Sequence, residues 1–375
     1  MKEFGVAIIG YGFIGKVHAF AYRNMGFYYD PPPARTRLVA VCASRPETAE
    51  AAKEHGGFEI CGTDAAEIIR RDDVDIVNIC TPNHLHKDEL LAAMEAGKSI
   101  YCDKPLTGTI EDAEALAPAI EQYSGVSQMT FNNRFALAAQ RAKQMIEEGF
   151  LGKATQFRAG YYHAGSVDPD KPMGWKQQAE AGGGVINDLA SHIIDLVDWL
   201  VGPIESVLAN TRILYPDRPA KGGARLRVEA EDSVTTLARL ADGGAGVIEA
   251  TKIATGTNDE LRVELHGDKG ALRFNTMQPN YLEAYDLADP ETPQGGTRGW
   301  KRIDTVHRFE KPGGWPGPKF AVGWTRSHVH CLCNFLAAVA EGRPASPSLA
   351  DGLRMQRMLE AVRRSARETA WTEMG

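Results

Sequence analysis

Short apolar runs alternate with amphipathic helical patterns along the first third of the chain. The apolar runs, each of a length suited to a buried strand, span residues 5–10, 37–43, 74–82 and 98–105. Helical patterns follow them at residues 16–25, 45–56, 86–97 and 109–124. Such alternation predicts a doubly wound α/β fold, in which right-handed crossovers join the strands of a parallel sheet. We expect this Rossmann-type domain to occupy residues 1–130.

The pattern changes after about residue 134. Longer runs then alternate polar and apolar residues, at 154–165, 204–215, 233–256 and 260–274. This alternation is typical of antiparallel strands with one buried face, and the glycine-rich stretch 241–246 indicates a hairpin. Helical patterns span 185–202, 326–341 and 348–368, whereas 289–321 is expected to be a long loop. We therefore predict an α+β domain with a large, mostly antiparallel open sheet over residues 131–375.

Composition and charge exclude several classes of partner. The net charge of −7 over 375 residues argues against nucleic acid and anionic membranes as partners. No apolar run approaches the roughly 20 residues that a bilayer-spanning helix needs. The first residues lack the layout of a signal peptide, and the six cysteines show no metal-type spacing. We expect a cytoplasmic protein without disulfides or a bound metal.

A glycine-rich turn joins the first predicted strand to the first predicted helix. Gly10, Gly12 and Gly15 have the spacing of a dinucleotide-binding loop, and the strand–turn–helix context strengthens the motif. The first glycine permits the tight turn, the second lets the backbone approach a pyrophosphate, and the third lets the helix pack on the strand. The free N–H groups of the helix start, at Phe13 and Ile14, suit phosphate.

The end of the second strand bears on the choice between NAD and NADP. An acidic residue there normally binds the adenosine ribose, but this chain has Ser44 and Arg45. A hydroxyl beside a guanidinium suits a 2′-phosphate, which favours NADP. The alternative is that Arg45 stacks on the adenine while NAD binds.

Three further residues carry candidate chemistry. Lys104 lies at the C-terminal end of the strand at 98–105, at the edge where parallel sheets bind ligands, although a surface lysine is the simpler interpretation of this residue alone. Asp188 and His192 are four residues apart and share one face of a largely apolar helix. Buried groups of this kind need partners or a cavity, and Asp188 could merely hold His192. Three glycines, residues 182–184, precede the helix and permit close approach.

Several of these motifs together resemble the Gfo/Idh/MocA oxidoreductases. The matching stretches are the glycine loop at 10–15, TPNHLH at 81–86, DKP at 103–105, FNNRF at 131–135, DLASH at 188–192 and ELHGDKGALRF at 264–274. Asp103 stands where the family usually has glutamate. Within the family, the chain looks closest to the inositol and levoglucosan dehydrogenase types.

The resemblance implies a catalytic set of Lys104, Asp188 and His192 around a substrate hydroxyl. His192 is our choice for the base that takes the hydroxyl proton, because an imidazole titrates near neutral pH. Lys104 would stabilise the developing negative charge on the same oxygen, and family assignments sometimes give it the proton transfer instead. Asp188 would orient the imidazole or bind a neighbouring hydroxyl.

The resemblance also assigns weaker contact residues. For the cofactor they are Thr81, Pro82, Asn83, His86, Asp103, Lys104, Asn133 and Trp175. For the substrate they are Lys104, Arg134, Lys176, Asp188 and His192. Tyr161 and His163 are added because their strand is expected to face the site, the alternative being that they are ordinary sheet residues. Lys176 replaces the arginine of a Trp-Arg pair found in relatives. His328 and His330 lie two apart, but without a third ligand in register they do not predict a metal site.

These features predict an NAD(P)-dependent dehydrogenase that acts on a sugar, cyclic polyol or glycoside. One alternative is a relative that holds NAD tightly and cleaves a glycosidic bond through transient oxidation. Another is a non-catalytic dinucleotide sensor, which the complete Lys, Asp and His set disfavours. A homodimer or homotetramer through the open sheet is expected from the resemblance and from the exposed sheet face.

Overall fold

Two sheets organise the protein in the computed structural model, which describes residues 1–220, 223–306, 310–315, 317 and 320–374. The first is a six-stranded parallel sheet in the order β3-β2-β1-β4-β5-β6. Its strands are β1 (Glu3–Ile9), β2 (Arg35–Cys42), β3 (Ile60–Gly62), β4 (Ile76–Ile79), β5 (Ser99–Cys102) and β6 (Ser127–Met129). The prediction of a Rossmann-type sheet is confirmed.

Helices cover both faces of this parallel sheet. They are α1 (Phe13–Tyr28), α2 (Pro46–Gly56), α3 (Ala65–Ile69), η1 (Asn83–Leu85), α4 (His86–Glu95) and α5 (Ile110–Gln122). Alternate residues of β1 enter two cores: Val6 and Ile8 pack with α1, whereas Ala7 and Ile9 pack with α4 and α5. Burial on both faces explains why these strands are almost continuously apolar.

The second sheet has nine strands in the order β16-β15-β14-β13-β7-β12-β11-β8-β17. All neighbours are antiparallel except β7 and β12. The strands are β7 (Ala154–Tyr162), β8 (Ile204–Arg212), β11 (Ser233–Leu240), β12 (Ala245–Thr251), β13 (Glu260–Gly267), β14 (Gly270–Asn275), β15 (Tyr281–Asp286), β16 (Lys301–Asp304) and β17 (Thr372–Glu373). The mostly antiparallel sheet is therefore confirmed, and the hairpin at 241–246 joins β11 to β12. A separate two-stranded sheet pairs β9 (Asp217–Pro219) with β10 (Arg225–Arg227).

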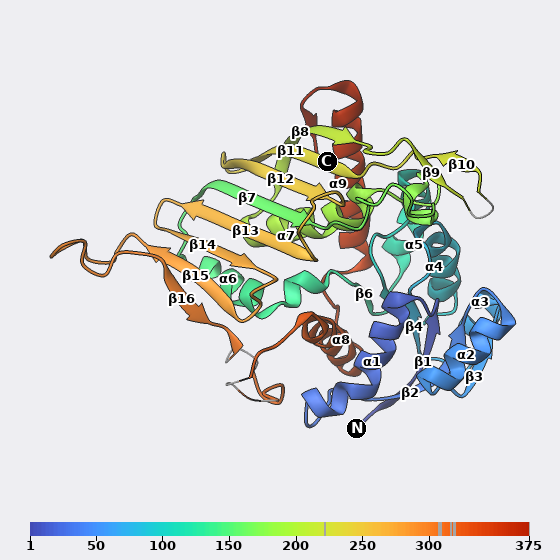
Figure 1. Cartoon of the computed structure of the whole chain (residues 1–375). Coiled ribbons are helices and arrows are strands. Elements are labelled where there is room, and N and C mark those ends of the chain that lie inside the picture. The colour runs from blue at the N-terminus through green and yellow to red at the C-terminus, as the bar shows by residue number, and fades with distance from the viewer. Residues whose placement is uncertain (221–222, 307–309, 316, 318–319, 375) are drawn as a thin grey trace.

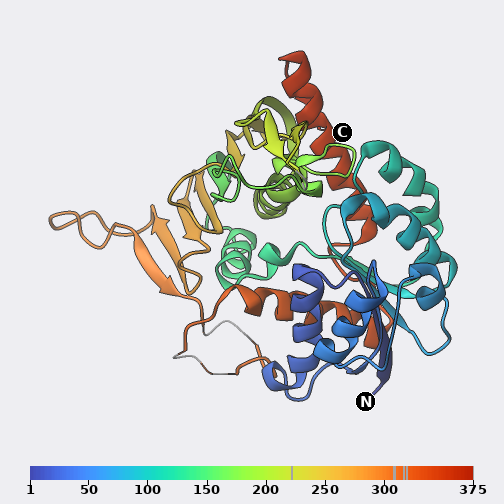
Figure 2. The same cartoon turned by 45° about the vertical axis from the view of Figure 1, so that its right-hand side comes forward.

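One face of the large sheet is covered and the other is open. Along β11, Val234, Thr236 and Ala238 are buried, while the residues between them, such as Leu237, are exposed. The helices α6 (Leu137–Glu147) and α7 (Ser191–Val201) lie on the covered face, toward the parallel sheet (Figures 1 and 2). The short turns η2 (Asn132–Phe135) and η3 (Trp175–Gln177) complete this region.

The last two helices return to the first sheet. Helix α8 (Trp324–Glu341) packs beside α1, and its Phe335 contacts Tyr101 of β5 at 5.1 Å between ring centroids. Helix α9 (Leu349–Glu368) packs on α5 and on β8 (Figure 1). The division at residues 130 and 131 stays a prediction, and the packing shows that residues beyond 320 complete the core around the parallel sheet.

Two local differences from the sequence expectations bear on the site. The helix expected at 185–202 begins as a π-helical turn, η4 (Ile186–Ala190), before α7 continues it; such turns are rare and often occur at functional sites. The loop expected at 289–321 contains β16, while residues 307–309, 316, 318 and 319 lie outside the described part. Within the described residues, no helix combines the length and hydropathy needed to cross a bilayer.

Candidate active site

A cavity of about 1380 Å³ separates the carboxyl ends of the parallel strands from the large sheet. Its volume exceeds that of an ordinary small-molecule pocket, which is roughly 300–1,000 Å³. Most residues predicted to bind cofactor or substrate line it. They are Gly10, Gly12, Phe13, Ile14, Ser44, Thr81, Pro82, Asn83, Asp103, Lys104, Asn133, Tyr161, His163, Trp175, Lys176, Asp188 and His192.

The glycine loop has the geometry that a dinucleotide requires. Gly10 has φ +91°, and a Cβ there would lie 2.7 Å from the backbone of Cys80. A Cβ on Gly15 would lie 2.2 Å from the Gly10 carbonyl oxygen, so this glycine permits the close packing of α1 on the strand end. A Cβ on Gly12 would meet nothing within 4 Å, because Gly12 faces open space. The residues present thus fit a pyrophosphate at the start of α1.

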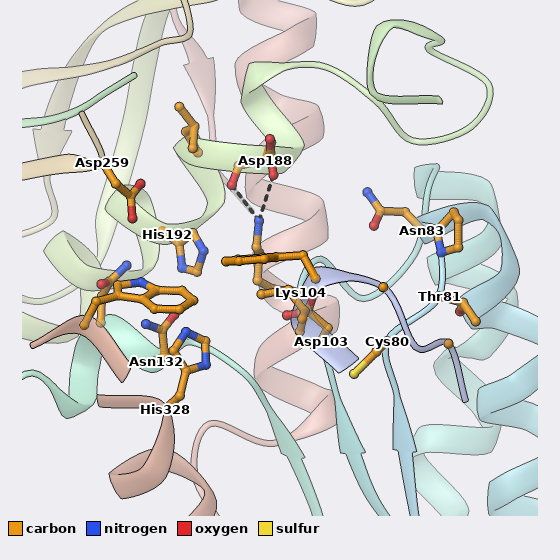
Figure 3. A pocket seen from close by; sticks show the side chains of 18 of the residues that line it. Cys80, Thr81, Asn83, Asp103, Lys104, Asn132, Asp188, His192, Asp259 and His328 are labelled. Atoms are coloured by element: carbon orange, nitrogen blue, oxygen red, sulfur yellow. Dashed lines mark hydrogen bonds and ion pairs between the residues drawn. The ribbon is translucent and has the colours of Figure 1, made fainter. Parts of the chain in front are cut away.

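Lys104 reaches from the end of the parallel sheet to the π-helical turn. It follows β5 by two residues, and its Nζ donates to the main-chain carbonyl of Asp188 at 2.6 Å. The same Nζ lies 3.3 Å from Asp188 Oδ1 (Figure 3). The end of the parallel sheet and the π-helical turn therefore meet at Lys104 and Asp188.

Asp188 binds lysines rather than His192. Besides Lys104, Lys176 Nζ lies 2.9 Å from Asp188 Oδ2, and Lys252 Nζ lies 3.0 Å from the same oxygen. Burial alone would raise the pKa of Asp188, but Lys252, Lys104 and Lys176 together hold it well below its usual value. The structure has no hydrogen bond between Asp188 and His192, both of which it describes, so Asp188 does not orient the imidazole directly.

His192 lies in the wall of the same cavity, toward Lys104 (Figure 3). Its Nδ1 is buried and has no hydrogen-bond partner in the described part of the chain. Burial is the main cause that holds the pKa of His192 well below its usual value of 6.5, and the ammonium group of Lys104 is the second. The imidazole is therefore uncharged at neutral pH, but it is a weaker base than the near-neutral titration expected from the sequence,.

The wall opposite the glycine loop carries Tyr161, a predicted substrate contact, and Asp259, which the sequence analysis did not select. Tyr161 belongs to β7, and burial, followed by the carboxylate of Asp259, raises the pKa of its hydroxyl well above its usual value. The Tyr161 ring lies 5.8 Å from the His192 ring. Asp259 lines the cavity directly before β13.

Helix α8 adds a further group of residues that the sequence analysis did not place in the cavity. Trp324 and His328 line it, and their rings lie 4.3 Å apart. Trp324 also stacks on Phe13 of the glycine loop, with 5.7 Å between ring centroids. Neither ring nitrogen of His328 has a hydrogen-bond partner among the described residues. The sequence analysis considered His328 solely as a metal ligand, and the described residues contain no group of three or more suited to a metal.

Two predicted contact residues lie outside the cavity because their polar groups are used elsewhere. The ring nitrogens of His86 lie 3.0 Å from the Thr81 carbonyl and 3.1 Å from the Pro105 carbonyl, so His86 joins two strand ends in the core. Arg134 donates to Asp195 from Nε at 2.8 Å and from Nη2 at 2.5 Å. This buried pair anchors η2 to α7, and the expected substrate contact of Arg134 stays a prediction.

Arg45 also lies outside the cavity. It caps the start of α2, and its Nε lies 3.3 Å from Glu47 Oε1; both side chains are 67% exposed. Its neighbour Ser44 does line the cavity. A phosphate bound to Arg45 would therefore lie near the carboxylate of Glu47.

Two family models match the chain in succession. Residues 4–131 match the model described as "Oxidoreductase family, NAD-binding Rossmann fold", and residues 139–273 match the "GFO/IDH/MocA C-terminal domain". The levoglucosan dehydrogenase of Pseudarthrobacter phenanthrenivorans is 34% identical over 390 residues, covering 100% of this chain and 99% of the relative. The inositol 2-dehydrogenase of Rhizobium meliloti is 29% identical, covering 96% of each.

Solved structures agree with this family match. A levoglucosan dehydrogenase in complex with NADH superposes with a TM-score of 0.95 at 35% identity, covering 100% of both chains. The complex of levoglucosan dehydrogenase with NADH and levoglucosan gives a TM-score of 0.94 at 35% identity, covering 99% of both chains. The similarity thus extends over both domains.

Proposed function

Because the chain belongs to the Gfo/Idh/MocA family of NAD-binding oxidoreductases, we propose that it transfers a hydride between a secondary hydroxyl of a sugar or cyclic polyol and a nicotinamide cofactor. The observation that carries this proposal is the meeting of Lys104 and His192 in one cavity with an open glycine loop. One residue comes from each domain, so the cavity joins a cofactor side to a substrate side.

The cofactor would lie along the ends of the parallel strands. The backbone of Gly12 and the first N–H groups of α1 would bind the pyrophosphate, because that helix end carries partial positive charge. Thr81, Pro82 and Asn83 follow β4 and would contact the ribose and the ring beyond it. A bound nicotinamide supplies the carbon that accepts or donates the hydride.

Lys104 and His192 would act on the substrate hydroxyl. In oxidation, the uncharged imidazole of His192 would accept the proton of the substrate hydroxyl, and the carbon that bears this hydroxyl would give its hydride to the nicotinamide. The ammonium group of Lys104 donates a hydrogen bond to the oxygen and stabilises its negative charge as it develops. Asp188 would position Lys104, since its main-chain and side-chain oxygens both contact the Lys104 ammonium group.

NAD rather than NADP is the cofactor that the geometry favours. The exposed Arg45 is paired with Glu47, whose carboxylate would repel a 2′-phosphate bound to that guanidinium,. The similar levoglucosan dehydrogenase structures were solved with NADH. This reverses the preference that Ser44 and Arg45 suggested in the sequence.

The substrate class follows from the relatives and from the polar lining. Tyr161, His163 and Asp259 provide side-chain oxygens and nitrogens that can form hydrogen bonds with hydroxyls,. The relatives named above act on levoglucosan and inositol, which are cyclic and rich in hydroxyls. We therefore propose an anhydrosugar or a cyclic polyol as the substrate.

A substrate panel tests the proposal. The purified protein is mixed with inositols, aldoses, anhydrosugars and glycosides, each with NAD and with NADP, and formation of reduced cofactor is followed by absorbance. We expect reduction of NAD with at least one cyclic substrate. Cleavage of a glycoside without added cofactor, by protein that retains nicotinamide absorbance, would instead establish the glycosidic alternative. Cofactor binding without turnover on any substrate would contradict both.

The open sheet face supports a proposal about assembly. Leu237 is 46% exposed on this face, and aromatic residues such as Trp300 and Tyr281 lie on the outer strands or beside them. We propose that two copies of the chain, or two such pairs, join through this face. Light scattering should give a dimer or tetramer mass, and Leu237→Glu should shift it toward the monomer. A monomeric wild-type protein would refute the assembly.

A further inference from the structure

Lys252 contacts Asp188 from a direction that no substrate can occupy. It follows the last residue of β12, and its side chain is 9% exposed. Asp188, Lys104 and Lys176 line the cavity, whereas Lys252 is not among the residues that line it. Lys252 therefore makes no direct contact with a substrate in this cavity, and Asp188 is the cavity residue to which its ammonium group binds.

The lysines divide the two oxygens of the Asp188 carboxylate between them. Lys252 binds Oδ2 at 3.0 Å, and Lys104 lies 3.3 Å from Oδ1. Lys176 contacts both oxygens, at 2.9 and 3.1 Å, but its side chain is 49% exposed. Since solvent screens the exposed lysine, the buried Lys252 provides the most constant contact with Oδ2.

The backbone around Lys252 is held firmly enough to fix its side chain. Its main-chain N–H donates to the Asp232 carbonyl at 2.8 Å, and its carbonyl accepts from the Ser166 N–H at 2.8 Å. Its Nζ also lies 3.5 Å from the carbonyl of Gly184, just before the π-helical turn. The ammonium group is thus attached to the large sheet while it contacts the turn that carries Asp188.

We propose that Lys252 is a positioning residue, which fixes the Asp188 carboxylate through Oδ2 and thereby directs Oδ1 and the adjoining carbonyl toward Lys104. The proposal rests on the proposed function, in which Lys104 binds the reacting oxygen. Without Lys252, the Asp188 carboxylate is free to rotate toward Lys176. The ammonium group of Lys104 is then no longer held in one orientation toward the reacting oxygen. A buried carboxylate that loses an adjacent cation also takes up a proton more readily.

Several titratable groups surround Asp188, and the lysines among them set the pH at which its carboxylate takes up a proton. The titratable groups that face it are Lys104 from the end of β5, Lys176 from η3, Lys252 from the end of β12, His192 from α7 and Tyr161 from β7. Of the cations, Lys252 has the largest effect in holding the pKa of Asp188 down. Its removal should therefore be visible in the titration of Asp188 even without substrate.

The test compares Lys252→Met with Lys252→Arg in the full-length protein. We expect the methionine variant to lose turnover by roughly tenfold to a hundredfold, because small misplacements of catalytic groups have such effects. The acid side of its pH–rate profile should move up by about one pH unit or more. Lys252→Arg keeps the charge and should restore most of the turnover. Lys269→Met, an exposed lysine at the β13–β14 turn, is the matched control and should behave as wild type.

A second measurement does not depend on activity. In protein labelled with carbon-13 at the aspartate carboxyl groups, the Asp188 signal is assigned by its loss in Asp188→Asn. Asp188 should titrate at higher pH in Lys252→Met than in wild type. An unchanged titration, or a loss of thermal stability with unchanged turnover and pH profile, would overturn the proposal. Failure of the wild-type protein to oxidise any substrate would refute the proposed function alone.

Discussion

The two sides of the cavity differ in how the chain builds them. On the cofactor side, Gly12, Ser44 and Thr81 all lie in loops that directly follow parallel strands, and their contribution is mainly backbone and small polar groups. On the substrate side, Lys104, Asp188 and Lys252 come from widely separated elements and interact through their charges. The first arrangement depends on local geometry, whereas the second depends on how both domains pack.

Buried carboxyl groups show the same contrast. Glu89 on the cofactor side accepts a hydrogen bond from Thr81 Oγ1 at 2.6 Å, and burial raises its pKa to about 7. Asp188 is also buried, but its lysine partners hold its pKa well below the usual value. The difference between these two acids follows the cations around them, because three lysines lower the pKa of Asp188 and no cation among the described residues lowers that of Glu89,.

The largest expected effect comes from the residue that joins the two sides. Lys104→Met should lower turnover by roughly 10²- to 10⁴-fold, because the reacting oxygen loses its cationic hydrogen-bond donor. Binding of NADH, measured by fluorescence, should change little. Lys87→Met is the matched control, since Lys87 pairs with Asp112 outside the cavity. Retained turnover in Lys104→Met would contradict the proposed role.

Removing Arg134 tests whether it belongs to the substrate side or to the core. Arg134→Met leaves Asp195 buried without its guanidinium, which should lower the free energy of unfolding by about 3–5 kcal/mol. The double variant Arg134→Met/Asp195→Leu should recover much of this loss. Urea unfolding measures the stability of the single and the double variant. The KM of Arg134→Met for the substrate should stay close to the wild-type value. A raised KM with unchanged stability would restore the substrate contact predicted from sequence.

Alanine at two glycines separates cofactor binding from folding. Gly12→Ala adds a methyl group in open space, so the fold should keep its stability while NADH binding weakens by about tenfold, equivalent to about 1.4 kcal/mol. Gly10→Ala should instead lower the melting temperature, because φ is +91° and the new Cβ would meet the Cys80 backbone. Thermal unfolding gives the melting temperature of both variants, and titration with NADH gives their affinity for the cofactor. Equal NADH affinity in Gly12→Ala and wild type would show that the phosphates bind elsewhere.

These contrasts explain how much of the site the sequence could predict. The roles of Gly10, Gly12 and Gly15 depend on spacing within one turn, and the structure agrees at each of them. The meeting of Lys104 with Asp188 was predicted because both lie in recognisable motifs. Lys252 has no motif: it is a lysine after an alternating strand, and its role depends on the parallel pairing of β12 with β7.

The misplaced residues have a related physical cause. His86 and Arg134 lie next to motif positions, but each finds a strong partner in the core, and sequence spacing does not reveal such partners. Trp324 and His328 reach the cavity because α8 packs on α1, a contact between residues more than 290 apart in the chain. The fold was more predictable because each sheet repeats one simple pattern along several strands.

The raised pKa of Glu89 predicts a pH-dependent stability on the cofactor side. Between about pH 4.5 and pH 7 the folded protein holds a proton on Glu89 that the unfolded chain releases, so this contribution to stability falls as pH rises through that range,. Glu89→Gln should remove the decline and raise the free energy of unfolding at pH 8 by about 1–3 kcal/mol. At pH 4 the two proteins should differ little. Urea unfolding at both pH values measures these free energies. If the free energy of unfolding changed with pH in the same way in wild type and Glu89→Gln, the raised pKa of Glu89 would be contradicted.

The smallest expected effect concerns the choice of nicotinamide cofactor. Glu47→Gln removes the carboxylate that pairs with Arg45 at an exposed site, so the gain for a 2′-phosphate should be no more than about 1 kcal/mol. The ratio of kcat/KM for NADP to that for NAD should therefore rise by roughly twofold to fivefold. The double variant Glu47→Gln/Arg45→Ala should lose this gain, because the guanidinium is then absent. If the ratio is the same in wild type and Glu47→Gln, Arg45 does not face the adenosine ribose, and the cofactor preference must come from Ser44 and the backbone around it.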